Sequence, residues 1–297
     1  MSVPSAYLGV IIIWSTTPLA ILWSSEEVGF MFGLTSRMLI GTALALITAA
    51  LLGTGLVWSR RALRAYLAAG LGIYGGMICV YWSAQFIPSG WISVIFGISP
   101  IATALMARLW LDGEILTRSK LIAMLIGLSG LAIMFSTSFT LHTEAVYGLL
   151  GMLISVSIHS ASAVWIKRIH VDIPAIVMTS GGLLFAAPLF FITWLLSGAS
   201  IPADISMRSI GAIAYLASLG SVLGFALYYY VLSKVDATRV ALLTLITPIC
   251  ALALGNVLNN EPLTFEIIVG SFLILSGLAT FELNGKVERI RARFLRY

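Results

Sequence analysis

The chain has 297 residues, of which 60% are hydrophobic and 10% are charged, and its mean hydropathy is +1.03. A soluble domain is about half apolar and about a quarter charged, so this composition excludes an ordinary water-soluble protein and indicates an integral membrane protein. The net charge of +5 does not indicate nucleic-acid binding, because the basic residues lie in short connectors and near the C-terminus.

Ten segments approach the length of about 20 apolar residues that a helix needs to cross a bilayer. The first lacks the basic start and the clear cleavage site of a removable signal peptide, so we expect it to remain as a membrane span. The connectors are too short to hold a soluble domain. In chain order, the predicted spans are Ala6–Trp23, Phe30–Leu52, Ala65–Phe86, Gly90–Leu111, Leu121–Phe135, Ala145–Ile166, Pro174–Leu196, Ser209–Leu232, Ala237–Leu258 and Thr264–Leu283.

The basic residues give this arrangement a direction. If the N-terminus is cytoplasmic, 15 of the 17 lysines and arginines fall inside, and only Arg37 and Arg208 fall outside. Such a bias is typical of cytoplasmic loops, and an odd number of spans would break the alternation. We therefore predict an all-α membrane protein of ten helices with both termini in the cytoplasm, and a basic tail that anchors the last helix at anionic headgroups.

The two halves of the sequence repeat each other. The segment Leu-Ser-Gly-Leu-Ala occurs at residues 128–132 and again at 275–279. A displacement of 148 residues, or 147 for the last pair, aligns Gly72 with Gly220, Gly76 with Gly224, Tyr81 with Tyr229, Pro100 with Pro248, and Glu114 with Glu261. Five spans are an odd number, so the second half must enter the membrane from the opposite side, as in the inverted repeats of secondary transporters. We expect the first repeat at 1–143, the second at 144–284 and a basic cytoplasmic tail at 285–297.

The aligned stretches carry a recognisable motif. Tyr81–Thr117 contains Ser-Pro and ends in Gly-Glu-Ile-Leu-Thr, and Gly224–Thr264 contains Thr-Pro and ends in Asn-Glu-Pro-Leu-Thr. Both resemble the signature of the drug/metabolite transporter superfamily, in its EamA-type exporter branch, and the resemblance covers essentially the whole chain. It implies a carrier in the bacterial cytoplasmic membrane, often one that exports amino acids or related metabolites.

Each repeat has a proline near the middle of its fourth span, at Pro100 and Pro248. A proline frees a backbone carbonyl, which lipid tolerates only if it is buried or faces a water-filled cavity. Ser99 and Thr247 stand just before the prolines and supply hydroxyls. We predict that these four residues form a bent, polar lining of a substrate site at the midplane. The alternative is a packing kink without ligand contact.

His159 is the ionisable residue that the sequence indicates deep inside a span, where such groups usually face a cavity or a partner. By motif position it matches Trp14, which Ser15 follows. We predict that Trp14 and His159 face each other across the substrate site, and we add Ser15 and Tyr74 to the substrate-binding candidates. Histidine titrates near physiological pH, so His159 is also the candidate for proton coupling. The alternative is a histidine bonded to a neighbouring helix for packing.

Two further pairs of repeat mates lie toward the membrane surfaces. Tyr81 and Tyr229 lie at mirrored depths, and we predict that they help to bind substrate and to close the outer and inner mouths of one pathway. The alternative for both is the aromatic belt at the interface. Glu114 and Glu261 are expected to cap the helices that follow them, and the alternative for both is ion binding.

The sequence lacks a central Asp or Glu in any predicted span, a phosphate-binding P-loop and a metalloprotease or nucleophile-elbow motif. We therefore expect no enzyme activity, cofactor or metal. The predicted function is a secondary transporter that exports small metabolites, with amino acids or related amphipathic compounds as the expected substrates. Its expected partners are the small-molecule substrate and the bilayer, and it is expected to be a monomer or homodimer. A lipid or nucleotide-sugar carrier, a flippase and a passive facilitator remain alternatives, and energy coupling stays open.

Overall fold

The computed structural model describes residues 2–111, 122–123, 125–130, 132–133, 144–198, 201–235, 240 and 247–294, without the side chains of residues 278 and 281–294. The regular structure of the described residues is helical. The expected spans 121–135 and 237–258 lie partly outside the described residues, and Glu114 lies outside them. The helices are α1 (Val3–Ser25), α2 (Phe30–Leu51), α3 (Arg60–Ser83), α4 (Ser89–Phe96), α5 (Ser99–Trp110), α7 (Ala145–Ile169), α8 (Ala175–Leu196), α9 (Met207–Tyr215), the π-helix η1 (Leu216–Leu223), α10 (Gly224–Lys234), α12 (Thr247–Asn259) and α13 (Phe265–Phe294).

Seven helical runs among the described residues are long and apolar enough to cross a membrane. They include α4 with α5 as one run, Ser89–Trp110, and α9 with η1 and α10 as another, Met207–Lys234. Two shorter apolar helices, Thr247–Asn259 and Phe265–Gly277, accompany them. The protein is therefore a multi-pass membrane protein, and the count of ten spans and the side on which the termini lie stay predictions.

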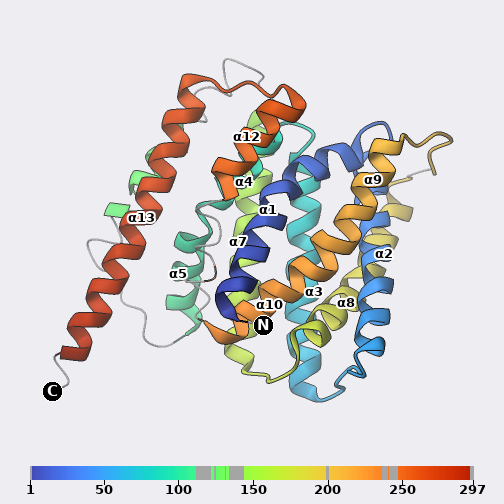
Figure 1. Ribbon diagram of the computed structural model, residues 1–297, viewed down its shortest axis with the longest axis horizontal. Coiled ribbons are helices and arrows are strands. Elements are labelled where there is room, and N and C mark those ends of the chain that lie inside the picture. The colour runs from blue at the N-terminus through green and yellow to red at the C-terminus, as the bar shows by residue number, and fades with distance from the viewer. Residues whose placement is uncertain are drawn as a thin grey trace.

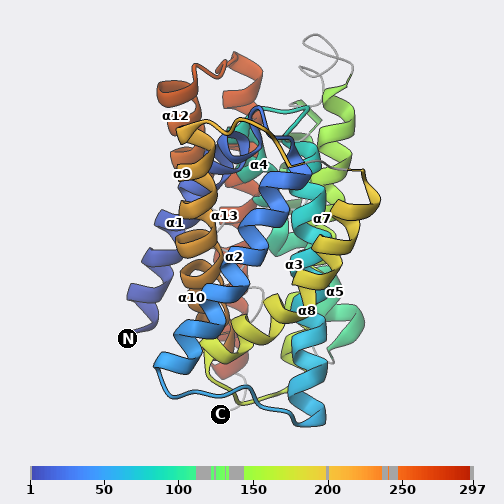
Figure 2. The same ribbon diagram turned by 90° about the vertical axis from the view of Figure 1, so that its right-hand side faces the viewer.

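The long helices α1, α2 and α3 alternate in direction along the bundle, as do α7, α8 and α9, and α13 stands at its edge (Figures 1 and 2). Several helices begin with a serine side chain that caps the first turn. The hydroxyl of Ser59 accepts a hydrogen bond from the amide of Ala62 at the start of α3, and that of Ser206 accepts one from Ser209 at the start of α9. Gly29, with φ of 79°, turns the chain from α1 into α2.

The two ends of the bundle differ in charge. We call the end that holds the connectors after α1 and α12 the acidic end, because Glu26, Glu27 and Glu261 lie there. The opposite end holds the start of α3 and the ends of α7 and α10, and we call it the basic end. Its basic residues at these termini are Arg60, Arg61, Arg64, Lys167, Arg168 and Lys234. The start of α1 and the end of α13 also point toward the basic end (Figure 1).

The fourth span is broken between α4 and α5, one turn before the position of Pro100. Proline cannot donate to the carbonyl four residues earlier, which here belongs to Phe96. That carbonyl instead accepts a hydrogen bond from the hydroxyl of Ser99, and the carbonyl of Ser99 accepts one from Ser160 of α7 at 3.4 Å. The bend that the sequence predicts at this proline is therefore present, and the carbonyl that the proline frees, that of Phe96, is satisfied by a hydroxyl.

The eighth span is interrupted in a different way, by the eight-residue π-helix η1 between α9 and α10. π-Helical turns are rare, carry an extra residue per turn and occur often at functional sites. Here the turn packs against α2 and contains Gly220 and Ser221.

Glycines bring the two halves of the chain into close contact along α3. A methyl group added at Gly72 would lie 2.3 Å from the hydroxyl oxygen of Ser162 on α7, and one at Gly70 would lie 3.0 Å from the carbonyl oxygen of Gly182 on α8. Such close approach of backbones is what small residues provide in membrane bundles. The first half thus packs against the second through α3.

Candidate functional site

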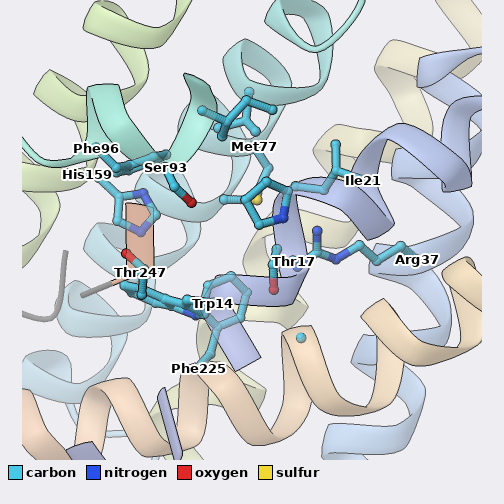
Figure 3. A pocket seen from close by; sticks show the side chains of 14 residues that line it. Trp14, Thr17, Ile21, Arg37, Met77, Ser93, Phe96, His159, Phe225 and Thr247 are labelled. Carbon is cyan, nitrogen blue, oxygen red and sulfur yellow. The ribbon is translucent and has the colours of Figure 1, made fainter. Parts of the chain in front are cut away.

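A pocket lies between helices of the first and second halves (Figure 3). Most of its wall is apolar, and a few polar side chains reach into it, which is the usual composition of a small-molecule site. The lining residues are Trp14, Thr17, Pro18, Ile21, Arg37, Met77, Val80, Ile92, Ser93, Phe96, His159, Gly220, Phe225 and Thr247.

Arg37 supplies the positive charge of this pocket. Its side chain comes from α2, is 1% exposed and points toward Thr17 in the pocket (Figure 3). The Nε atom donates a hydrogen bond to the hydroxyl of Ser221 at 3.0 Å, and Nη1 donates one to the hydroxyl of Tyr81 at 3.4 Å. The guanidinium carbon lies 5.9 Å from the centre of the Tyr81 ring, within the range of a cation–π contact.

The position of Arg37 corrects two sequence-based predictions. The tally of basic residues placed Arg37 on the outer side, whereas it is buried inside α2, two turns from the start of that helix. His159 is consequently not the single deep ionisable residue. The signal that could have revealed Arg37 is that it is the only charged residue of α2, well inside an apolar run.

Aromatic side chains form the wall opposite Arg37 (Figure 3). The ring of His159 lies 5.9 Å from that of Phe96 and 6.2 Å from that of Tyr228, and the ring of Trp14 lies 5.3 Å from that of Tyr228. Among the described residues, Nδ1 of His159 has no hydrogen-bond partner. The structure therefore brings Trp14 and His159 into one pocket, with Tyr228 in ring contact with both.

Hydroxyl groups complete the polar lining. Thr17 donates to the carbonyl of Ile13 at 2.7 Å, so its oxygen still has a free lone pair, and Ser93 points into the pocket (Figure 3). Thr247 stands at the start of α12, beside Trp14 and His159 in the same view. Sequence reasoning selected Thr247 through its proline, but it missed Thr17 and Ser93 because hydroxyl residues are frequent in every span.

Several predicted site residues lie outside the pocket lining. The hydroxyl of Ser15 donates to the carbonyl of Ile11 in its own helix, and that of Tyr74 lies 2.7 Å from the hydroxyl of Thr193 on α8. Ser99 and Pro100 form the break in the fourth span, and Pro248 follows Thr247 in α12 without lining the pocket. These residues shape or support the helices around the pocket.

The two tyrosines proposed as gates lie on opposite sides of the pocket. Tyr81 is fully buried, and its hydroxyl lies 3.3 Å from that of Ser24 near the acidic end of α1. Tyr229 lines another pocket, at the basic end, together with Lys167, His170 and Lys234. The rings of Tyr228 and Tyr229 are 5.2 Å apart, so this pair lies between the central pocket and the basic-end pocket.

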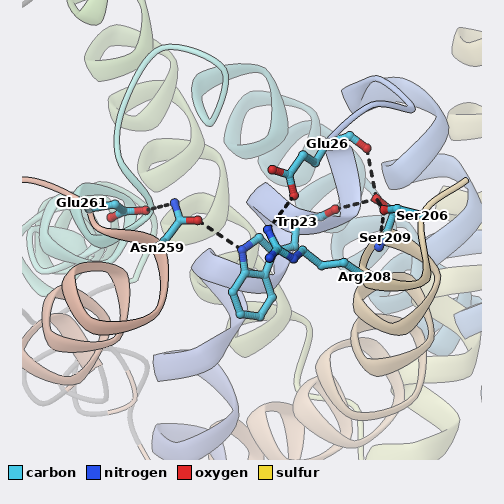
Figure 4. Close-up of polar contacts among 7 residues, drawn as sticks. All are labelled: Trp23, Glu26, Ser206, Arg208, Ser209, Asn259 and Glu261. Atoms are coloured by element: carbon cyan, nitrogen blue, oxygen red, sulfur yellow. Dashed lines mark hydrogen bonds and ion pairs between the residues drawn. The ribbon is translucent and has the colours of Figure 1, made fainter.

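Polar contacts close the acidic end (Figure 4). Glu261 is 8% exposed, and its carboxylate accepts hydrogen bonds from the backbone amides of Ser89 at 3.0 Å and Gly90 at 3.1 Å. It thus caps the start of α4 in the first half, and the prediction that it caps the following helix is wrong. That role falls to Thr264, whose hydroxyl accepts a hydrogen bond from the amide of Ile267.

The same network continues to α1 and α9. Asn259 donates to Glu261 at 3.2 Å and accepts a hydrogen bond from the indole of Trp23 at 3.3 Å. Arg208 pairs with Glu26 at 3.4 Å, with both side chains largely exposed. The described residues therefore link α1, α4, α9 and α12 at the acidic end.

Comparison with known proteins gives a consistent result. The EamA-like transporter family matches residues 3–136 and 146–281. An uncharacterized transporter of Archaeoglobus fulgidus is 27% identical over 213 residues, which cover 70% of this chain and 74% of that protein. A probable amino-acid metabolite efflux pump of Salmonella typhimurium is 26% identical over 233 residues, which cover 75% and 78%.

Other similarities agree with these. The uncharacterized inner membrane transporter YedA of Escherichia coli is 26% identical over 196 residues, which cover 65% of this chain and 61% of that protein. A solved crystal structure that is 20% identical in sequence superposes with a TM-score of 0.72 and covers 96% of this chain and 99% of its own. The overall fold is therefore shared with a solved protein.

Proposed function

Because this chain belongs to the EamA-like transporter family and is a multi-pass membrane protein, we propose that it exports small amphipathic metabolites by alternating access at the central pocket. Amino acids and related compounds are the leading substrate class, and the bacterial cytoplasmic membrane is the proposed location. The protein acts as a secondary transporter rather than an enzyme, as a monomer or homodimer, with the bilayer as its other partner.

The observation that carries this proposal is the placement of the pocket between the halves. Its lining comes from α1 to α4 of the first half and from α7, η1, α10 and α12 of the second. A site built in this way changes its access whenever one half rocks against the other, as inverted-repeat carriers do. The probable amino-acid metabolite efflux pump among the relatives supports the choice of substrate class.

The contacts around the pocket suggest which barriers alternate. At the acidic end, Trp23, Asn259 and Glu261 hold α1, α12 and α4 together. At the basic end, Tyr228 and Tyr229 separate two neighbouring pockets. We propose that Tyr81 and Tyr229 act as the outer and inner gates, with release on the acidic side.

The lining also bears on the alternative substrates. Among the described residues, a single guanidinium and no lysine line the pocket, whereas a nucleotide sugar carries a diphosphate that requires more positive charge. Proton coupling is assigned to His159, whose ring lines the pocket and whose Nδ1 is unpaired among the described residues. If His159 does not carry a proton, the same architecture works as a passive facilitator.

Efflux from liposomes tests the function. The purified protein is reconstituted, and a panel of labelled amino acids, their deaminated acids and small amines is loaded inside, with and without a pH gradient. Saturable and stereoselective efflux of one class supports the carrier. Efflux that does not saturate indicates a channel, and movement of labelled lipid without movement of the panel indicates a flippase. Either of these results would reject the proposal.

A further inference from the structure

Within the part of the chain that the structure describes, Arg37 is a buried cation without an anionic partner. Among the described residues, the recorded ion pair is that of Arg208 with Glu26 at the acidic end, and no Asp or Glu lines the central pocket. The groups that contact the guanidinium are the hydroxyls of Ser221 and Tyr81, which carry no formal charge. A buried charge without a counterion is costly, and inside membrane proteins such groups mark ligand or ion pathways.

The geometry leaves part of the guanidinium available. It has five N–H donors in a fixed planar fork, and the recorded contacts use one donor on Nε and one on Nη1. A methyl group at position 220 would lie 3.2 Å from Nη2, so the lack of a side chain at Gly220 lets this nitrogen approach η1, and both residues line the pocket. A planar carboxylate matches such a fork, with two parallel hydrogen bonds.

A purely structural role explains Arg37 less well. If the arginine served the repeated scaffold, the corresponding helix of the second half would be expected to carry one too. That helix, α8, has no charged residue along its 22 positions. Of these two helices, only α2 of the first half carries a positive charge. This asymmetry is expected of a group that binds a ligand rather than one that supports the repeated scaffold.

We propose that Arg37 binds the carboxylate of an amphipathic monocarboxylic acid, whose apolar or aromatic body lies against Trp14, Phe96 and Phe225. This inference rests on the proposed transport function, because it names the class of cargo. The α-ammonium group of an amino acid finds no carboxylate in the described lining. The deaminated acid therefore binds at least as tightly as the amino acid itself.

Three probes of nearly equal size separate the contributions. They are 3-phenylpropionate, which has a carboxylate alone, phenylalanine, which has both charges, and phenylalaninamide, which lacks the carboxylate. Binding to the purified full-length protein is measured by calorimetry and by the ligand-induced rise in melting temperature. For the wild type, we expect phenylalaninamide to bind roughly 10- to 100-fold more weakly than 3-phenylpropionate, the range for loss of charge-assisted hydrogen bonds.

Variants then assign the effect to Arg37. Arg37→Gln should lose the preference for acid over amide, and Arg37→Lys should keep part of it, because a lysine retains the charge without the planar fork. Arg208→Gln is the matched control, since Arg208 lies at the acidic end in an exposed ion pair, and it should behave as the wild type. If Arg37→Gln does not fold, the comparison of probes on the wild type and on Arg37→Lys still decides.

Each result has a defined meaning. Equal affinity for acid and amide in the wild type, no binding of any probe, or an unchanged preference in Arg37→Gln would overturn the proposal. Binding that prefers carboxylates in a protein that moves none of the panel through liposomes would reject the transport function while leaving the Arg37 site in place. Saturable efflux that ignores the carboxylate would keep the transport function and reject this site.

Discussion

The Nε atom of Arg37 and the hydroxyl oxygen of Ser221 are joined by a hydrogen bond of 3.0 Å between residues 184 positions apart in the chain. The bond connects α2 of the first half to the π-helix η1 of the second. Ser221 is fully buried, so no water competes for its oxygen. The contact fixes the plane of the guanidinium and thereby the direction of the donors that face the pocket.

Removal of this contact should weaken ligand binding without removal of the charge. Ser221→Ala takes away the acceptor of one hydrogen bond, and we expect the affinity for 3-phenylpropionate to fall by about 2- to 10-fold, as for one ordinary hydrogen bond. Ser218→Ala is the control, because Ser218 lies in the same π-helix but bonds the carbonyl of Ala214 and faces outward. Equal affinities of the two variants in calorimetry would show that Ser221 does not position Arg37.

Substitution of His159 should separate transport from its driving force. His159→Gln keeps a polar side chain of similar size that cannot take up a proton. In liposomes we expect saturable efflux to persist, while the acceleration by a pH gradient disappears. Ser157→Ala on the same helix, whose hydroxyl bonds its own helix at Leu153, should keep the acceleration. A gradient response that survives in His159→Gln would assign the proton to another group or to none.

The close packing of the two halves predicts a large difference between two glycines. Gly72→Ala places a methyl group 2.3 Å from the Ser162 hydroxyl and 2.4 Å from its Cβ, and we expect a loss of about 1–3 kcal/mol in unfolding free energy. Gly211→Ala meets no atom within 4 Å and should leave the stability unchanged or slightly raised. Thermal unfolding in detergent measures both. Equal midpoints would show that α3 and α7 are less tightly packed than described.

The cap at the acidic end predicts a further contrast. Glu261→Ala leaves the amides of Ser89 and Gly90 without their acceptor, and we expect a loss of about 1–3 kcal/mol, because a buried charge-assisted interaction is removed. Glu261→Gln keeps one carbonyl oxygen and should fall between. Glu26→Ala breaks an exposed ion pair and should cost less than about 1 kcal/mol. The order of the three melting temperatures tests the assignment, and a variant Glu261→Ala as stable as Glu26→Ala contradicts it.

Hydropathy was enough to locate several helices. The span predicted at Phe30–Leu52 is the helix Phe30–Leu51, and that predicted at Ala145–Ile166 is Ala145–Ile169. These segments are long, continuous apolar runs. In lipid, a single segment can form all its backbone hydrogen bonds internally only as a helix. The break near Pro100 was also predictable, because proline disrupts the hydrogen bond to residue 96 wherever it stands within a helix.

The contacts between the two halves could not be predicted from the sequence. No local pattern marks Leu216–Leu223 as a π-helix, and the partner of Glu261 lies 171 residues away at Gly90. The preference for basic residues inside assigns a side to each charge but no depth, so it counted Arg37 as external. Tyr74 was predicted to bind substrate, yet the angular position of a side chain on its helix is set by its neighbours, here Phe190 and Thr193.

The charge that α2 carries and α8 lacks makes the two halves unequal partners. When inverted repeats exchange conformations, a cargo held by Arg37 stays with the first half throughout. The two resting states then differ in electrostatic energy, and the cargo concentration that half-saturates the protein should differ between the two faces of the membrane. Microscopic reversibility requires that this difference leave the final distribution of an uncoupled cargo unchanged. In the absence of proton coupling, the duplicated chain therefore transports its cargo faster in one direction at a given concentration, without any power to concentrate it.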